Sequence, residues 1–134
     1  MSSGATVNVI RSRVVGGVTV KEVVGSPSVR QFVEAVDEIY QDRPTIMVVW
    51  DFTHGSPGEL RSEDLRRIAG HVRRSAALRA NGRTAMIAPG DLAYGMGRVL
   101  EVLRELEELP LEFRVFRTAT EAAEWLGIEG LMDV

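Results

Sequence analysis

The spacing of hydrophobic and polar positions changes along the chain, and its most distinctive stretch is an unbroken apolar run at residues 45–52, Thr-Ile-Met-Val-Val-Trp-Asp-Phe. Such a run is typical of a strand that is covered on both faces of a sheet. Its β-branched and aromatic residues, and the glycine- and proline-rich loop that follows, favour a strand over a helix. We therefore predict an interior strand at 45–52 with the carboxylate of Asp51 near its end.

Two strands are predicted before this run, at 7–10 and 14–24, where Gly16-Gly17 is either a turn or a bulge in one longer strand. A helix follows, capped by Ser26 with Pro27 at its first position. Its apolar residues recur at helical spacing and form one stripe toward the sheet: Val29, Phe32, Val33, Val36 and Tyr40. This helix and the strands on either side of it predict a right-handed βαβ unit.

Helices and strands continue to alternate after the interior strand. The predicted elements are a second helix from a cap at Ser62 to Asn81-Gly82, a strand at 84–88, a third helix capped by Asp91, a strand at 111–116 of edge character, and a short fourth helix that opens with a capping box at Thr118 and Glu121. The third helix is expected to turn five apolar residues toward the core: Leu92, Met96, Val99, Leu103 and Leu106.

This alternation predicts a single α/β domain over residues 1–134, with a mixed, mostly parallel sheet of four or five strands and four helices. Residues 1–5 are expected to be disordered, because they are small, polar and terminal. We see no internal repeat, low-complexity tract or domain boundary, so a second domain is not expected.

Composition narrows the function classes. The net charge of −3 makes nucleic acid an unlikely partner, since phosphate binding favours a basic domain. The chain has no cysteine, and neither a signal-peptide pattern nor a run of about 20 apolar residues is seen, so we expect a cytoplasmic protein without a membrane span. Asp51, His54 and Ser56 share one flexible loop, which does not supply the rigid supports of a catalytic triad. We therefore expect no enzyme activity, no cofactor and no metal.

Two motifs carry a family resemblance: Ala-Pro-Gly-Asp-Leu-Ala-Tyr-Gly-Met-Gly-Arg at 88–98, and Val-Phe-Arg-Thr-Ala-Thr-Glu-Ala-Ala-Glu-Trp-Leu at 115–126. With the order of elements from about residue 18 onward, they resemble the SpoIIAA-like, STAS/SEC14-related small bacterial proteins, whose function is mostly unassigned. The resemblance implies a (βα) superhelix with helices mainly on one face of the sheet. It also implies a regulatory role without catalysis.

Sporulation regulators with this fold carry a phosphorylatable serine at the start of the helix after the central strand. Ser62 occupies about that place here, and the resemblance makes it a candidate phosphorylation site. The flanking residues differ, because the regulators have Asp-Ser-Ser-Gly and this chain has Arg-Ser-Glu-Asp at 61–64. Two acidic neighbours would repel an added phosphate.

The second predicted helix suggests a partner surface. Seven arginines and only two acidic residues lie between positions 61 and 83, whereas glutamates predominate between 101 and 112. A surface of this charge steers an acidic protein partner. The loop at 53–61 would contribute to this surface together with the candidate residues Ser62, Arg66, Arg67, Arg73 and Arg74.

The alternative hypothesis is a small-ligand site at the carboxyl ends of the strands, where open α/β sheets bind their ligands. An anionic or amphipathic, lipid-like molecule would place its charge on helix N-termini. The candidate residues are Asp51, His54, Asp91, Tyr94, Arg98 and Thr118. Gly95 and Gly97 each weaken the third helix, so we expect close packing, a ligand or a second chain there, and a homodimer is one of these possibilities.

Overall fold

The computed structural model describes residues 7–41, 43–58 and 60–128. The expected disorder at residues 1–5 therefore lies outside the described residues. The strands are β1 (Val9–Val15), β2 (Val18–Gly25), β3 (Met47–Gly55), β4 (Arg83–Ile87) and β5 (Glu112–Phe116). The helices are α1 (Val29–Tyr40), α2 (Ser62–Arg73), the 3-10 helix η1 (Ala76–Arg79), α3 (Asp91–Leu106) and α4 (Ala119–Leu126).

The five strands form one sheet in the order β1-β2-β3-β4-β5. The β1–β2 pair is antiparallel, and the other three pairs are parallel. The prediction of a mixed, mostly parallel sheet with four α-helices is confirmed. β3 lies in the middle of the sheet, where Val48 and Val49 are fully buried, so the predicted interior strand is also confirmed. It runs from Met47 to Gly55 rather than over 45–52, so Asp51 lies inside the strand and not near its end.

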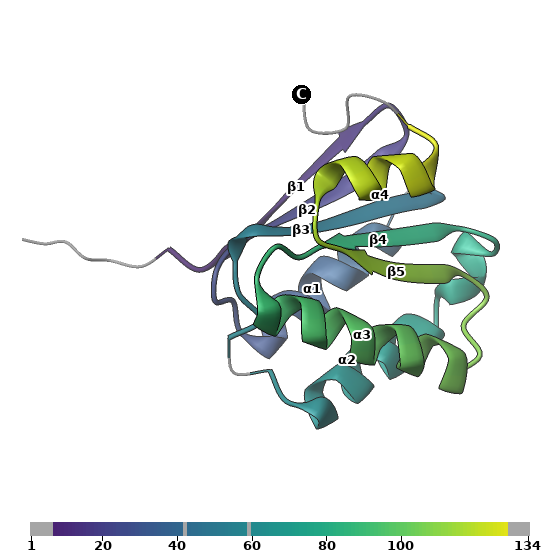
Figure 1. The fold of residues 1–134 in the computed structure, drawn as a ribbon. Helices are drawn as coiled ribbons and strands as arrows, with labels where there is room; N and C mark the ends of the chain where they lie inside the picture. The colour runs from purple at the N-terminus through teal and green to yellow at the C-terminus, as the bar shows by residue number, and fades with distance from the viewer. Residues whose placement is uncertain (1–6, 42, 59, 129–134) are drawn as a thin grey trace, which may run out of the picture.

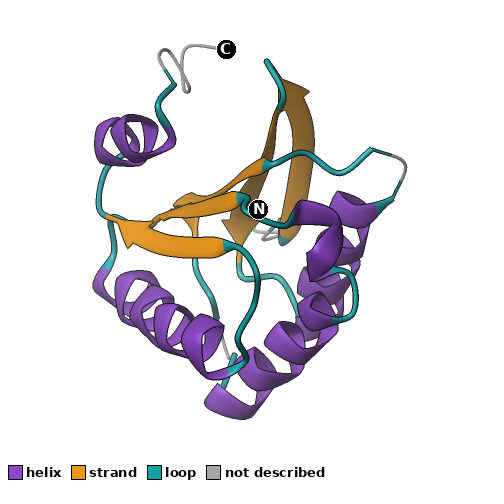
Figure 2. Cartoon of the chain, turned by 90° about the vertical axis from the view of Figure 1, so that its right-hand side faces the viewer, coloured by secondary structure: helices purple, strands orange, loops and turns teal. Residues whose placement is uncertain are grey.

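Helices cover both faces of the sheet, but unequally. Figures 1 and 2 show α1, α2 and α3 on one face and α4 alone on the other. α4 packs Ala122 and Leu126 against Val20 and Val49. On the opposite face, Phe32 of α1 and Ala93 of α3 pack against the sheet. The expectation that the helices lie mainly on one face agrees with this arrangement.

The N-terminal hairpin resolves the two readings of Gly16-Gly17. Both glycines have positive φ angles, 55° and 79°, which L-residues with side chains rarely adopt, and they form the turn between β1 and β2. β1 therefore runs from residue 9 to 15, and the predicted break after residue 10 was wrong. Pairing with β2 continues without interruption along β1, which holds residues 11–13 in the strand.

Several predicted helix starts were displaced by one or two residues. The N-cap of α1 is Ser28, not Ser26, because the Ser28 hydroxyl accepts from Gln31 N while the Ser28 N–H donates to the Gln31 side chain. Arg61 is the N-cap of α2, so Ser62 is its first helical residue, and Gly90, not Asp91, is the N-cap of α3. The predicted cap at Thr118 is confirmed, since its hydroxyl accepts from Glu121 N at 3.2 Å.

The second helix is shorter than predicted. α2 ends at Arg73, and a separate 3-10 turn, η1, occupies much of the remaining stretch before Asn81-Gly82. Arg79 in this turn is 2% exposed and donates to the Ile46 carbonyl just before β3 and to the Arg83 carbonyl at the start of β4. This anchoring explains why the chain leaves the α-helical path before residue 79.

The predicted core stripe of α3 was wrong for three of its five residues, while Leu103 is buried and Met96 packs against the core. Leu92, Val99 and Leu106 are 61%, 40% and 72% exposed, whereas Ala93, Gly97 and Leu103 are buried. The helix lies so close to the sheet that small residues face it, and most of the bulky apolar side chains of the predicted stripe point outward. The alternative of close packing holds for Gly97, because a Cβ there would come within 2.5 Å of Val115 Cγ2.

Candidate functional site

The candidate partner surface begins where α2 begins. Ser62 is exposed at the first helical position, directly after the N-cap Arg61. The Asp64 carboxylate accepts from the Arg61 backbone N–H at 2.9 Å, so it closes the helix start from within the chain. The Ser62 hydroxyl is accessible, and acidic side chains follow it at positions 63 and 64.

Four arginines line the outer side of α2 in two rows. Arg66 and Arg73 form one row and Arg67 and Arg74 the other, because a spacing of seven residues returns to nearly the same side of a helix. All four are exposed. Arg73 pairs with Glu107 at 3.0 Å, which places its row on the side toward α3. Within the described ranges, no ion pair is found for the other three.

Two other basic residues of this region do not join the surface. Arg79 is buried, and its guanidinium donates to the carbonyls of Thr45, Ile46 and Arg83 and to the Thr84 hydroxyl. Burial lowers the pKa of Arg79 from its usual value, while the neighbouring Tyr40 opposes the shift. His71 pairs with Asp37 and links α2 to α1.

The first two residues of the predicted ligand site have different environments. Asp51 is 3% exposed, and its carboxylate accepts from the Thr53 backbone N–H at 2.9 Å and from the Thr53 hydroxyl at 2.5 Å. These bonds hold the carboxylate against the backbone of its own strand. His54, three residues further, is exposed.

Asp91 and Tyr94 are joined through Arg117, a residue that the sequence did not single out. Arg117 Nη1 donates to Asp91 Oδ1 at 2.8 Å and to the Pro89 carbonyl at 3.1 Å. Its guanidinium also lies 4.0 Å from the centre of the Tyr94 ring, a cation–π contact. Thr118 follows directly and caps α4. The cluster thus ties the start of α3 to the end of β5.

Arg98 belongs to a different part of the surface. It pairs with Glu101 at 3.3 Å and lines a polar cleft between α3 and β5. Glu101 in turn accepts from the Val115 backbone N–H at 2.9 Å, and Arg104 donates to the Leu111 carbonyl at 2.6 Å. The six candidate ligand residues therefore occupy several separate environments and do not form one site.

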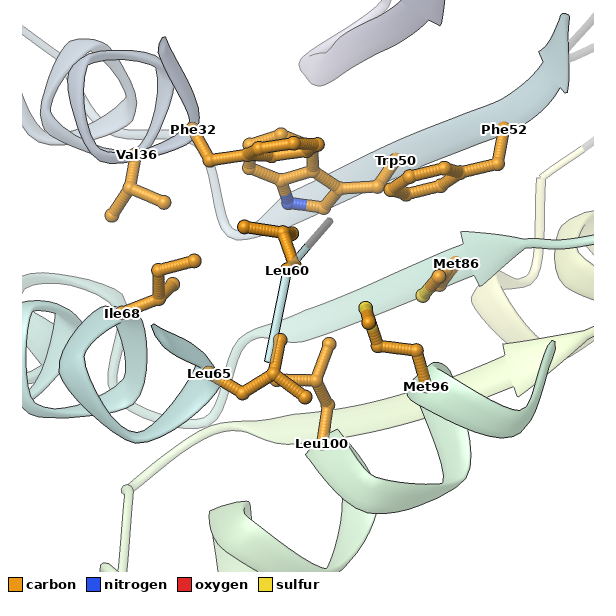
Figure 3. A pocket seen from close by; sticks show the side chains of 10 residues that line it. All are labelled: Phe32, Val36, Trp50, Phe52, Leu60, Leu65, Ile68, Met86, Met96 and Leu100. Atoms are coloured by element: carbon orange, nitrogen blue, oxygen red, sulfur yellow. The ribbon is translucent and has the colours of Figure 1, made fainter. Parts of the chain in front are cut away.

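An apolar cavity of about 90 Å³ lies between the sheet and helices α1, α2 and α3 (Figure 3). Phe32 of α1 stacks on Phe52 of β3 with ring centres 6.1 Å apart, and Trp50 lies 6.2 Å from Phe32. The remaining lining residues are all apolar: Val36, Leu60, Leu65, Ile68, Met86, Met96 and Leu100. The sequence pattern predicts that Phe32, Val36 and Met96 face the core. It does not predict the cavity, which forms only where α1, α2 and α3 meet above the sheet.

Residues 7–41, 43–58 and 60–128 contain no cluster of three or more His, Asp or Glu side chains arranged to hold a metal ion. Across the same ranges, every helix is too short or too polar to cross a membrane.

Comparisons with known proteins add a fold relationship. No protein-family model matches the chain, and no curated protein matches it. Among solved structures, the chain is similar to an uncharacterised protein of the DUF3478 family from Shewanella loihica, described as having a SpoIIAA-like fold. The two are 19% identical, the match covers 94% of this chain and 98% of the other, and the TM-score is 0.55. The chain therefore has a SpoIIAA-like fold, as its sequence motifs suggested.

Proposed function

We propose that this protein is a non-enzymatic, STAS-like regulatory module that binds an acidic surface of another protein. The binding surface consists of the end of β3 from residue 53, the residues that lead from it to α2, Ser62 and the arginines of α2. The observation that carries this proposal is the set of exposed α2 arginines, of which only Arg73 has an ion-pair partner within the described residues. Like charges on neighbouring turns of a helix are mildly unfavourable, and an acidic partner would offset this repulsion.

Phosphorylation of Ser62 would regulate this surface. The hydroxyl is exposed at the first position of α2, and a phosphate there would add about two negative charges at neutral pH next to the arginine rows. It would lower the positive potential that attracts the partner, so phosphorylation should weaken binding. Intact mass of protein purified from its native host detects the modification, and Ser62→Asp should mimic its effect in the capture experiment below.

The proposal is tested by capturing partners from a lysate of the native host with the wild type and with Arg67→Glu/Arg74→Glu. These two arginines form the row that faces away from α3. The matched control, Arg11→Glu/Arg43→Glu, makes the same charge change at exposed positions elsewhere. A partner retained by the wild type and the control but lost with the α2 variant supports the proposal. A partner list that does not change with the α2 variant contradicts it.

A second candidate function follows from the cavity in Figure 3: binding of a small, largely apolar ligand between β3 and the three helices. Phe32, Trp50 and Phe52 would contact its body, and Leu60 lies over it from the loop before α2. A thermal-shift screen with short fatty acids and aromatic compounds tests this candidate. A bound ligand at one hundred times its Kd adds about 2.7 kcal/mol of stability. Leu100→Phe, which fills the cavity, should abolish the shift, and a screen without any shift rejects the candidate.

A further inference from the structure

α3 carries an exposed apolar stripe along its outer side. Leu92, Val99, Val102 and Leu106 are 61%, 40%, 54% and 72% exposed. Together with Gly95 they occupy positions 92, 95, 99, 102 and 106, separated by three, four, three and four residues. This alternation is the spacing of a coiled-coil seam, in which each such residue faces a second helix. We call these five residues the α3 seam.

Gly95 is the residue of the α3 seam that has no side chain. A Cβ at this position would meet nothing within 4 Å, so the fold of the single chain does not require glycine there. Glycine inside a helix nevertheless costs about 1 kcal/mol relative to alanine. The missing side chain lets another helix backbone approach closely at this turn. Gly97 provides the contrast, because its own sheet fills the space beside it.

The two flanks of the α3 seam differ in the charged side chains that they expose. On the flank toward α2, Arg66 and Arg73 form the inner arginine row, located there by the pair between Arg73 and Glu107. The flank toward β5 carries both signs, because arginines 98, 104 and 114 and glutamates 101, 105 and 112 line the cleft there. Arg98 is paired with Glu101, and Arg104 donates to the Leu111 carbonyl. In the described part of the chain, Glu105 has no ion pair. One flank is therefore basic, and the other exposes a carboxylate.

We propose that the α3 seam is the interface of a homodimer in which the two α3 helices lie parallel across a two-fold axis. An axis along the helices places the α2 flank of each copy beside the β5 flank of the other. Arg66 and Arg73 of one copy then face the glutamates of the second copy. A two-fold axis perpendicular to the helices would make the pair antiparallel and set the arginine rows of the two copies against each other. Charge complementarity thus selects the parallel pair.

This dimer occupies Arg66 and Arg73, two of the four α2 arginines of the proposed partner surface, and leaves Arg67, Arg74 and Ser62 for another protein. It therefore goes beyond the proposed regulatory function, and it can be tested with the purified protein alone. Failure of the partner-capture experiment would not contradict the homodimer. Failure to observe the homodimer would not contradict the proposed partner surface.

The first experiment measures molecular mass by light scattering and sedimentation over a dilution series. The wild type should be a dimer at the upper concentrations. Val99→Asp/Val102→Asp, which places carboxylates in the middle of the α3 seam, should be a monomer with a native circular dichroism spectrum. Val14→Asp/Leu78→Asp, at exposed apolar positions on β1 and η1, should remain a dimer. A monomeric wild type at every concentration, or a dimer that survives the seam substitutions, overturns the proposal.

The second experiment tests the parallel arrangement by exchanging charges. Glu105→Lys alone and Arg66→Glu/Arg73→Glu alone should each weaken the homodimer, because each places like charges across the interface. Mixing the two variants should favour a heterodimer, in which the intact arginine row faces Glu105 and the reversed row faces the lysine introduced at position 105. Differently tagged chains make this heterodimer detectable. Weakening without recovery on mixing contradicts the parallel pairing.

Discussion

Gly97 of α3 lies so close to Val115 of β5 that a Cβ at residue 97 would come within 2.5 Å of Val115 Cγ2 and 2.6 Å of Val115 Cβ. A β-branched side chain on a strand cannot move aside easily. Gly97→Ala should therefore destabilise the protein by about 1 to 3 kcal/mol, despite the higher helix propensity of alanine. Urea unfolding at one fixed protein concentration measures the change.

Gly95→Ala provides the matched test of the same substitution two residues away. Because the new methyl group meets nothing within 4 Å in the single chain, only the propensity gain remains there, and the free energy of unfolding of the monomer should rise by up to about 1 kcal/mol. Equal effects at the two glycines would mean that α3 does not lie as close to β5 as described.

Lys21 should be sensitive to the loss of its partner. Its side chain is 1% exposed, and Nζ donates to Glu38 Oε1 at 2.8 Å and to Ser12 Oγ at 2.7 Å. Glu38→Ala leaves a buried ammonium without its counter-charge and should cost about 1 to 3 kcal/mol. Lys21→Met removes the charge itself and should cost less. Chemical denaturation of both variants gives the order, and a larger loss for Lys21→Met would contradict this account.

Arg79→Lys should behave unlike a conservative substitution. The guanidinium satisfies three carbonyls and one hydroxyl at once, and an ammonium has neither the reach nor the five donors to replace it. We expect a loss of about 2 kcal/mol in thermal or urea unfolding. Arg74→Lys on the surface should change stability by no more than about 0.5 kcal/mol. Similar values for both variants would show that the Arg79 network contributes little.

Alanine substitutions at Thr118 and Thr120, at the start of α4, should have different effects on the free energy of unfolding. Thr118→Ala removes the N-cap of α4 and should lower the free energy of unfolding by about 1 kcal/mol. Thr120 is exposed inside the helix, so Thr120→Ala should be neutral or slightly stabilising. Differential scanning calorimetry of the two variants distinguishes the cap from general threonine replacement.

The fold was predictable where the pattern of apolar residues had one structural solution. Residues 45–52 could only be an interior strand, because both of its faces are apolar, and helices alternating with strands required a mainly parallel sheet. The apolar pattern does not define the residue at which each helix begins. Ser26 and Ser28 are both capping residues, and only the reciprocal bonds with Gln31 select Ser28.

The α3 prediction failed for a specific physical reason. A hydrophobic pattern gives weight to large side chains, so Leu92, Val99 and Leu106 were assigned to the core. The close approach of α3 to β5 reserves the sheet-facing side for Ala93 and Gly97, whose small size carries little signal in a sequence. These three exposed residues, which the pattern wrongly assigned to the core, are part of the α3 seam.

The candidate sites depended on contacts that are distant in sequence. Arg117 reaches Asp91 and Tyr94 across 26 and 23 residues, which no local motif reveals. The sequence does not distinguish Arg79 from the exposed arginines of α2. Its burial follows from contacts with β4, which comes later in the chain. The exposed arginines of α2 were predicted because helical spacing alone separates them from the buried Leu65 and Ala69.

The side chains of Glu101 and Arg104 form hydrogen bonds with backbone groups at the edge of β5. Without them, these groups would be available for pairing with an additional strand. β5 is the last strand on its side of the sheet, and open edges of this kind invite pairing with other chains and growth into aggregates. The Glu101 carboxylate already binds the Val115 N–H, and the Arg104 guanidinium binds the Leu111 carbonyl just before the strand. An incoming strand would have to displace both charged side chains, so α3 also protects this protein against edge-to-edge polymerisation.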